Sequence, residues 1–196
     1  MKKSLIVLLI VVLVVVIIFG SIRGTYNKMV TMNEGVTAQW SQVENVYKRR
    51  SDLIPNLVNT VKGYATHERE TLEGVIEARA KATQVTVDPS KLDAASIQKF
   101  QEAQGGLSSA LGHLMVVMEQ YPDLKANQNF LELQAQLEGT ENRITVERGR
   151  FNEAAQNFNI YIRQFPQNLF ASMFGFEKKA YFEAVKGSEK APEVKF

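Results

Sequence analysis

Cysteine is absent from this sequence of 196 residues, and histidine occurs only twice. The absence of cysteine excludes disulfides, thiolate metal sites, a cysteine nucleophile and a lipid-modified N-terminal cysteine. Neither His67 nor His113 has a second histidine three or four residues away, and Glu68 and Glu70 beside His67 are typical of the first turn of a helix. We therefore expect no metal and no cofactor.

An excess of charge of one sign is also missing, because 23 Lys and Arg residues accompany 21 Asp and Glu residues. This balance excludes the basic patch of a nucleic-acid-binding protein, so we expect no nucleic acid as a partner. Gly105 and Gly106 lack the strand and the lysine of a phosphate-binding loop, and no serine lies in a Gly-x-Ser-x-Gly nucleophile turn. The sequence therefore predicts a protein that is not an enzyme.

One long hydrophobic run is present, since residues 5–22 form the uncharged sequence LIVLLIVVLVVVIIFGSI. As a helix with a rise of about 1.5 Å per residue this run spans about 27 Å, close to the roughly 30 Å hydrocarbon layer of a bilayer. A cleaved signal peptide is the alternative, but its apolar core usually has about 7–15 residues and ends in an A-x-A-like site. We predict a single-pass transmembrane helix over residues 5–22, after a short N-terminal tail of residues 1–4.

Positive charges on the two sides of this run are balanced, with Lys2 and Lys3 before it and Arg23 and Lys28 after it. The free N-terminal amine tips the count, and the positive-inside rule then puts the short N-terminus in the cytoplasm. We therefore expect the lipid bilayer as a partner and the rest of the chain outside the cytoplasm. A cytoplasmic location is the alternative.

Apolar residues recur every seven positions after the anchor, which predicts long helices that pack through heptad seams. The first long helix is expected over residues 24–65, where Pro55 kinks it without ending it. A short second helix precedes a loop over residues 84–91, because Asp-Pro starts a turn there. A third helix is expected over residues 92–121.

The fourth helix is expected over residues 127–165. It carries the clearest repeat, made of Phe130, Leu137, Ile144, Phe151, Phe158 and Phe165. Two long and two shorter helices with short connections favour an all-α fold in which residues 24–166 form an antiparallel up-down four-helix bundle. Gly105, Gly106 and Gly112 fall inside the third helix, and we expect them to allow close approach of a neighbouring backbone.

Three charged residues occupy seam positions where apolar residues are expected: Arg50 in the first long helix, and Glu141 and Arg148 in the fourth. In an antiparallel pairing these positions lie at similar heights, so the three side chains can meet. A buried network of this kind fixes the register of the helices more than it adds stability. The alternative is that the long side chains extend out of the seam into a solvated groove.

The tail over residues 167–186 is rich in aromatic residues and follows Pro166. If the fourth helix returns toward the anchor, the tail begins near the membrane, and we predict that it lies at the lipid headgroups. The residues suited to this interface are Leu169, Phe170, Met173, Phe174, Phe176, Lys178 and Lys179. The alternative is a plug that closes the base of the bundle or docks on a neighbouring subunit. Residues 187–196 are predicted to be disordered because they consist mainly of Gly, Ser, Pro and charged residues.

Residues 49–58, with the sequence RRSDLIPNLV, closely resemble the signature of the bacterial LemA family, and residues 78–80 and 165–177 are similar as well. The likeness covers nearly the whole chain, including the anchor. This resemblance implies a membrane-anchored helical bundle of the bacterial envelope, in the inner membrane and without an assigned enzymatic activity. It also implies a membrane protease of the HtpX type as a partner.

Three functions compete on this basis. We expect a membrane-anchored helical scaffold or adaptor that self-associates into a homo-oligomer, because an anchor and a long first helix occur without catalytic residues. The alternative is a sensory or regulatory module that binds a small ligand and adjusts an envelope membrane protease, for which the glycines of the third helix are the only hint of a cavity. An enzyme is the least supported of the three.

Overall fold

The computed structural model describes residues 2–65 and 67–183, and these residues contain helices and no strand. The prediction of an all-α protein is confirmed. The predicted disorder of residues 187–196, and residues 184–186 of the predicted tail, lie outside the described residues. The helices in chain order are α1 (Lys2–Lys62), α2 (Arg69–Gln84), α3 (Ala94–Met118), α4 (Pro122–Lys125), α5 (Gln128–Arg163) and α6 (Gln167–Phe174).

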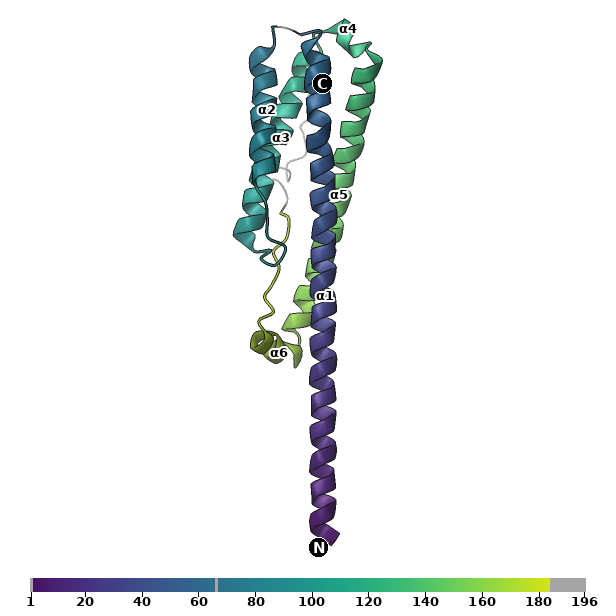
Figure 1. Ribbon diagram of the computed structural model, residues 1–196, viewed down its shortest axis with the longest axis vertical. Coiled ribbons are helices and arrows are strands. Elements are labelled where there is room, and N and C mark those ends of the chain that lie inside the picture. Colours follow the sequence, from purple (N-terminus) through teal and green to yellow (C-terminus); the bar gives the residue numbers. More distant parts are fainter. Residues whose placement is uncertain (1, 66, 184–196) are drawn as a thin grey trace, which may run out of the picture.

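Helix α1 continues without a break from the apolar run into the rest of the protein, and Pro55 lies inside it. The large apolar side chains of residues 5–19 are exposed, from 47% for Val14 to 70% for Phe19. Among the described residues, α1 is the one helix long and apolar enough to cross a membrane. Figure 1 shows its N-terminal part extending alone beyond every other helix, as is consistent with a membrane protein.

Helices α1 and α5 lie side by side along most of α5 (Figure 1). Residues later in α1 contact residues earlier in α5. Trp40 packs on Phe151, whereas Tyr64, just after α1, accepts a hydrogen bond from Asn127, just before α5. The heptad residues of α5 are buried from Phe130 to Phe158, but Phe165 is 80% exposed, so its predicted place in the seam was wrong. The reason is that α5 ends at Arg163, just before the helix-breaking Pro166.

Buried apolar residues form two clusters along the helices. The proximal cluster lies nearer the apolar run and surrounds Trp40 and Phe151, whereas the distal cluster surrounds Leu57 and Leu114. Helix α2 adds buried residues to the distal cluster alone, and Phe182 from the segment after α6 completes the proximal one. In Figure 1, α2 and α3 accompany only the upper part of α1, and this segment rises from α6 toward their lower ends. The C-terminal segment therefore closes the half of the core that α2 leaves open.

The glycines of α3 do not have the role predicted for them. A Cβ added at Gly105, Gly106 or Gly112 would meet no atom within 4 Å. All three are exposed, because the buried stripe of α3 runs along its other face through Leu107 and Leu114. The expected close approach of a backbone was therefore wrong, and the hint of a cavity at these glycines is lost with it.

Candidate functional site

Among the described residues, Arg50 has the least exposed charged side chain, at 2%. Its Nη1 donates to Ser108 Oγ of α3 and to Glu141 Oε2 of α5, each at 2.8 Å. Its Nη2 donates to the side-chain Oε1 of Gln104 at 2.7 Å and to the backbone oxygen of the same residue at 3.2 Å. Four charge-assisted hydrogen bonds therefore hold α1, α3 and α5 together at one level.

The ion pair lies at the edge of this layer, because the Glu141 side chain is 54% exposed. The interior partner of Arg50 is Gln104, which is 5% exposed and donates from Nε2 to the backbone oxygen of Ala82 at the end of α2. Helices α1, α2, α3 and α5 thus meet in a polar layer between the two apolar clusters. Nothing in the sequence singled out Gln104, since one glutamine inside a helix gives no periodic signal.

Arg148, the third predicted member of the network, has other hydrogen-bond partners. Its Nη2 donates to the backbone oxygen of Glu183 at 3.0 Å, and its guanidinium lies 4.7 Å from the ring centroid of Phe182. It nevertheless shares a neighbour with Arg50, whose guanidinium lies 5.1 Å from the ring centroid of Tyr47. Burial raises the pKa of Tyr47, while the charges of Arg148 and Arg50 act to lower that pKa. Within the described residues, Arg148 and Arg50 therefore share no hydrogen-bond partner, although the charges of both act on Tyr47.

Pro55 creates a second polar contact between α1 and its neighbours. Proline has no N–H, so the carbonyl of Ser51, four residues earlier, lacks its usual intrahelical donor. Arg79 of α2 supplies one, because its Nε donates to Ser51 O at 2.7 Å, and Ser51 is 3% exposed. The proline and arginine of the two family-like motifs thus act together to attach α2 to α1.

Helix α6 lies against α1 just beyond the apolar run. The rings of Tyr26 and Phe174 meet edge to face, with 4.9 Å between centroids. Leu169 and Met173 of α6 are exposed at 59% and 63%, whereas Phe170 packs against the proximal cluster. The predicted interface residues therefore divide between an open face and the core.

Gly175 ends α6 in a left-handed conformation, with φ at 74°, and the chain then turns back along the bundle. Phe176 lies 5.9 Å from Tyr26 between ring centroids and is partly buried in the proximal cluster. Lys178 is exposed, but Lys179 is only 7% exposed, and its Nζ lies 6.0 Å from the ring centroid of Phe158. The expectation that Lys179 faces lipid headgroups was wrong, because the turn at Gly175 directs it into the bundle.

Two asparagines of α5 hold the backbone of this returning segment. Asn159 accepts from the Lys179 N–H and donates to the Lys179 carbonyl, both at 2.8 Å. Asn152 does the same for Phe182, at 2.8 Å and 2.9 Å. Sequence reasoning missed both, although each directly follows a heptad phenylalanine and the two are seven residues apart.

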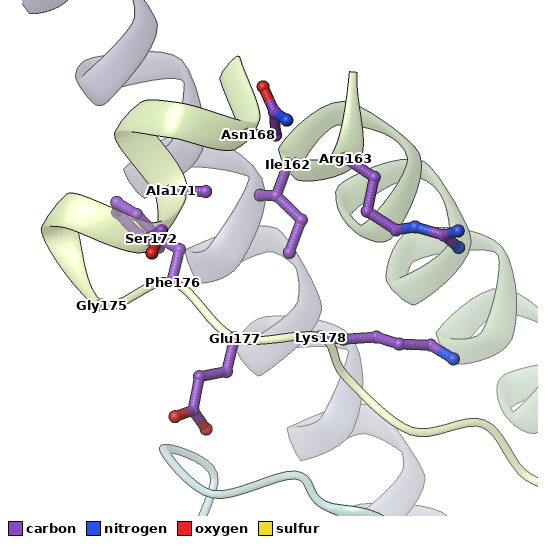
Figure 2. A pocket seen from close by; sticks show the side chains of 9 residues that line it. All are labelled: Ile162, Arg163, Asn168, Ala171, Ser172, Gly175, Phe176, Glu177 and Lys178. Carbon is purple, nitrogen blue, oxygen red and sulfur yellow. The ribbon is translucent and has the colours of Figure 1, made fainter. Parts of the chain in front are cut away.

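A shallow hollow of about 410 Å³ lies between the end of α5, helix α6 and the residues after it. Figure 2 shows Ile162 and Ala171 lining its inside, while the side chains of Arg163 and Lys178 extend together on one side. Within the described residues no group of three or more His, Cys, Asp or Glu side chains could hold a metal ion. The candidate functional features of the described structure are therefore the polar layer around Arg50 and the C-terminal segment that Asn152 and Asn159 hold.

The described residues form helices without strands, and the apolar, exposed N-terminal part of α1 is consistent with a membrane protein. A sequence model of the LemA family matches residues 39–196, so this chain belongs to the LemA family. The resemblance of residues 49–58 to that family is confirmed.

Several curated relatives are similar to most of the chain. Magnetosome protein MamQ 2 of Paramagnetospirillum magneticum is 29% identical over 176 residues, which cover 81% of this chain and 64% of the relative. Magnetosome protein MamQ of Magnetospirillum gryphiswaldense is 28% identical, with 80% and 64% covered. Protein LemA of Metamycoplasma hominis is 26% identical over 161 residues, with 82% and 70% covered. The chain spans less than two thirds of the MamQ relatives, and none of these names states an enzymatic activity, which favours a non-enzyme.

Proposed function

We propose that this protein is a non-enzymatic, membrane-anchored helical scaffold or adaptor of the bacterial inner membrane, with its helices arranged as an antiparallel up-down four-helix bundle. The observation that carries the proposal is the packing of α6 on Tyr26. Tyr26 lies four residues beyond the apolar run, which is about 6 Å along a helix. Helix α6 then lies at the boundary between hydrocarbon and headgroups.

The exposed residues around α6 support this placement. The apolar side chains of Leu169, Met173 and Phe165 are 59%, 63% and 80% exposed and are free to enter the outer part of the hydrocarbon layer. Arg163 and Lys178, beside the hollow in Figure 2, are exposed cations suited to lipid phosphate. Helix α6 thus acts as an interfacial helix that sets the height of the bundle above the membrane.

The absence of cysteine allows a direct test with single labels. Met173→Cys, on the exposed face of α6, carries a fluorophore in the full-length chain reconstituted into liposomes that contain headgroup-region spin-labelled lipid. We expect strong quenching at this position. The matched control is Asn142→Cys on the exposed face of α5, which should be quenched weakly. Equal, weak quenching at both positions would show that α6 does not lie at the membrane interface.

Cysteine labelling also tests on which side of the membrane the bundle lies. We propose that the bundle is extracytoplasmic, so Asn142→Cys should react with a membrane-impermeant maleimide in intact cells. Protection of this cysteine until the cells are lysed would place the bundle in the cytoplasm instead.

Self-association is the second element of the proposal, since a scaffold without a catalytic site acts through contacts with other proteins. The mass of the full-length chain in detergent or nanodiscs should correspond to a defined oligomer, and a strict monomer would contradict this element. The regulatory module for a membrane protease of the HtpX type is the alternative, and it rests on the resemblance alone.

A further inference from the structure

Residues 179–183 are held in the way that a groove holds a bound peptide. Each of Asn159 and Asn152 contacts both the N–H and the carbonyl of one backbone residue. Seven residues of a helix rise by about 10.5 Å, and three residues of an extended chain span about 10 Å. The spacing of the two asparagines therefore matches the spacing of Lys179 and Phe182, so that the pair reads an extended backbone in register.

Side chains on α1, α3 and α5 complete the groove around this backbone. Phe182 stacks on Trp40, with 5.9 Å between centroids, and meets Phe151 edge to face at 5.5 Å. Beyond it, Gln101 and Arg148 both donate to the backbone oxygen of Glu183, at 2.8 Å and 3.0 Å. The groove thus combines sequence-tolerant backbone clamps with one aromatic pocket, which is a mode of peptide recognition.

The connection between α6 and the groove is mostly exposed, although Phe176 within it packs against Tyr26 and Phe158. Gly175, Glu177 and Lys178 are exposed, and the φ of 74° at Gly175 gives the chain a turning point there. We propose that the groove is an exchange site that takes residues 176–183 of a second copy of this chain in place of its own. The inference rests on the proposed self-association and gives it a location.

Two observations favour a second copy as the occupant. The segment of a neighbour has the same sequence and therefore makes the same clamps and fills the same pocket, as in an isologous exchange. The exposed apolar run of α1 anchors neighbouring copies in one membrane in the same orientation, so their grooves and segments lie at one height and at high effective concentration.

The test is complementation between two defective full-length chains that carry different affinity tags. Phe182→Ala keeps an intact groove but has a segment that binds weakly. The double variant Asn152→Ala, Asn159→Ala, called the groove variant, keeps an intact segment but has a groove that binds weakly. When these chains are co-expressed and extracted in mild detergent, capture of one should recover the other at least about tenfold better than either mixture of two identically defective chains. Asn142→Ala, exposed on α5, is the control that should behave as wild type.

The outcomes separate the exchange from self-association in general. If the complementary pair shows no excess while the wild type still forms a defined oligomer, the exchange is wrong and self-association stands. If the wild type is also a monomer, both are wrong.

A second measurement covers the case in which a variant folds poorly. The synthetic peptide FEKKAYFE, which is residues 176–183, should raise the unfolding temperature of the Phe182→Ala chain and leave that of the groove variant unchanged. No effect on either chain would show that the segment is a permanent part of the core, and would overturn the proposal.

Discussion

The distal and proximal clusters are built on the same two long helices but are closed in different ways. The distal cluster is chiefly aliphatic, and α2 and α3 complete it. The proximal cluster is aromatic and combines Trp40, Tyr47, Phe100, Phe151, Phe158 and Phe182. One half of the core is thus closed by helices alone, while the other needs a non-helical segment from the C-terminal end of the described chain. The exchange proposed above requires that the second kind of closure open and re-form while the helices stay folded.

The polar layer around Arg50 separates these halves and fixes how the helices align. A shift of one heptad between α1 and α5 would bring Gln134 or Arg148 beside Arg50 in place of Glu141, because the three residues are seven positions apart on α5. Loss of the half-exposed carboxylate alone costs little, but Arg148 in its place would bring a second cation beside the buried Arg50, which disfavours that alignment. The layer therefore supplies specificity, and the two clusters on either side supply most of the apolar burial.

The largest effect should come from breaking the layer at its interior partner. Gln104→Leu removes one hydrogen bond to the buried Arg50 and leaves the carbonyl of Ala82 without its side-chain donor. We expect a loss of about 2–3 kcal/mol in the free energy of unfolding, because a buried charge and a buried carbonyl both lose partners. Urea unfolding of the full-length chain in detergent measures this loss.

Two further variants test whether the loss comes from the charge. Adding Arg50→Met to Gln104→Leu removes the cation that has lost its interior side-chain partner and should restore most of the stability, since an apolar layer of similar volume tolerates burial. Glu141→Ala should cost less than about 1 kcal/mol, because the Glu141 side chain is half exposed and solvent screens the pair. An additive double variant, or a Glu141→Ala loss as large as that of Gln104→Leu, would contradict this account of the layer.

The comparison also shows what the sequence could and could not predict. The heptad repeats indicated the seams of α1 and α5, since Trp40 and Phe151 follow from spacing alone. The position of Arg50 in an apolar series marked it as unusual before its partners were known. Asn152 and Asn159 could not be assigned a role, because their partner is the backbone of a distant segment. The path of that segment depends on the left-handed turn at Gly175, which leaves no periodic pattern.

A smaller effect on stability is expected from a substitution on the exposed face of α3, because residues on this face belong to neither cluster. Gly106→Ala adds a Cβ that meets no atom within 4 Å, and alanine restricts the unfolded chain more than glycine does. We expect a gain of about 0.5–1 kcal/mol in the free energy of unfolding. Gly175→Ala is the contrasting variant, since its positive φ should make the same substitution destabilising. A loss of stability in Gly106→Ala would indicate a partner on this face of α3.

The smallest effect concerns Lys179, the one lysine that is buried among the described residues. Burial lowers the pKa of Lys179 below its ordinary value of 10.5, although Glu177 acts to raise that pKa. Below this value the unfolded chain binds more protons than the folded chain, so the contribution of Lys179 makes stability rise as the pH increases toward 10.5. Solvent screening at the edge of the groove keeps the change below about 0.5 kcal/mol. Lys179→Met should flatten this rise in thermal unfolding as the pH is raised toward 10.5, whereas the exposed Lys178→Met should retain it. The same slope in both variants would mean that the Lys179 side chain leaves the groove in solution, and the clamp would then hold the segment through its backbone and Phe182 alone.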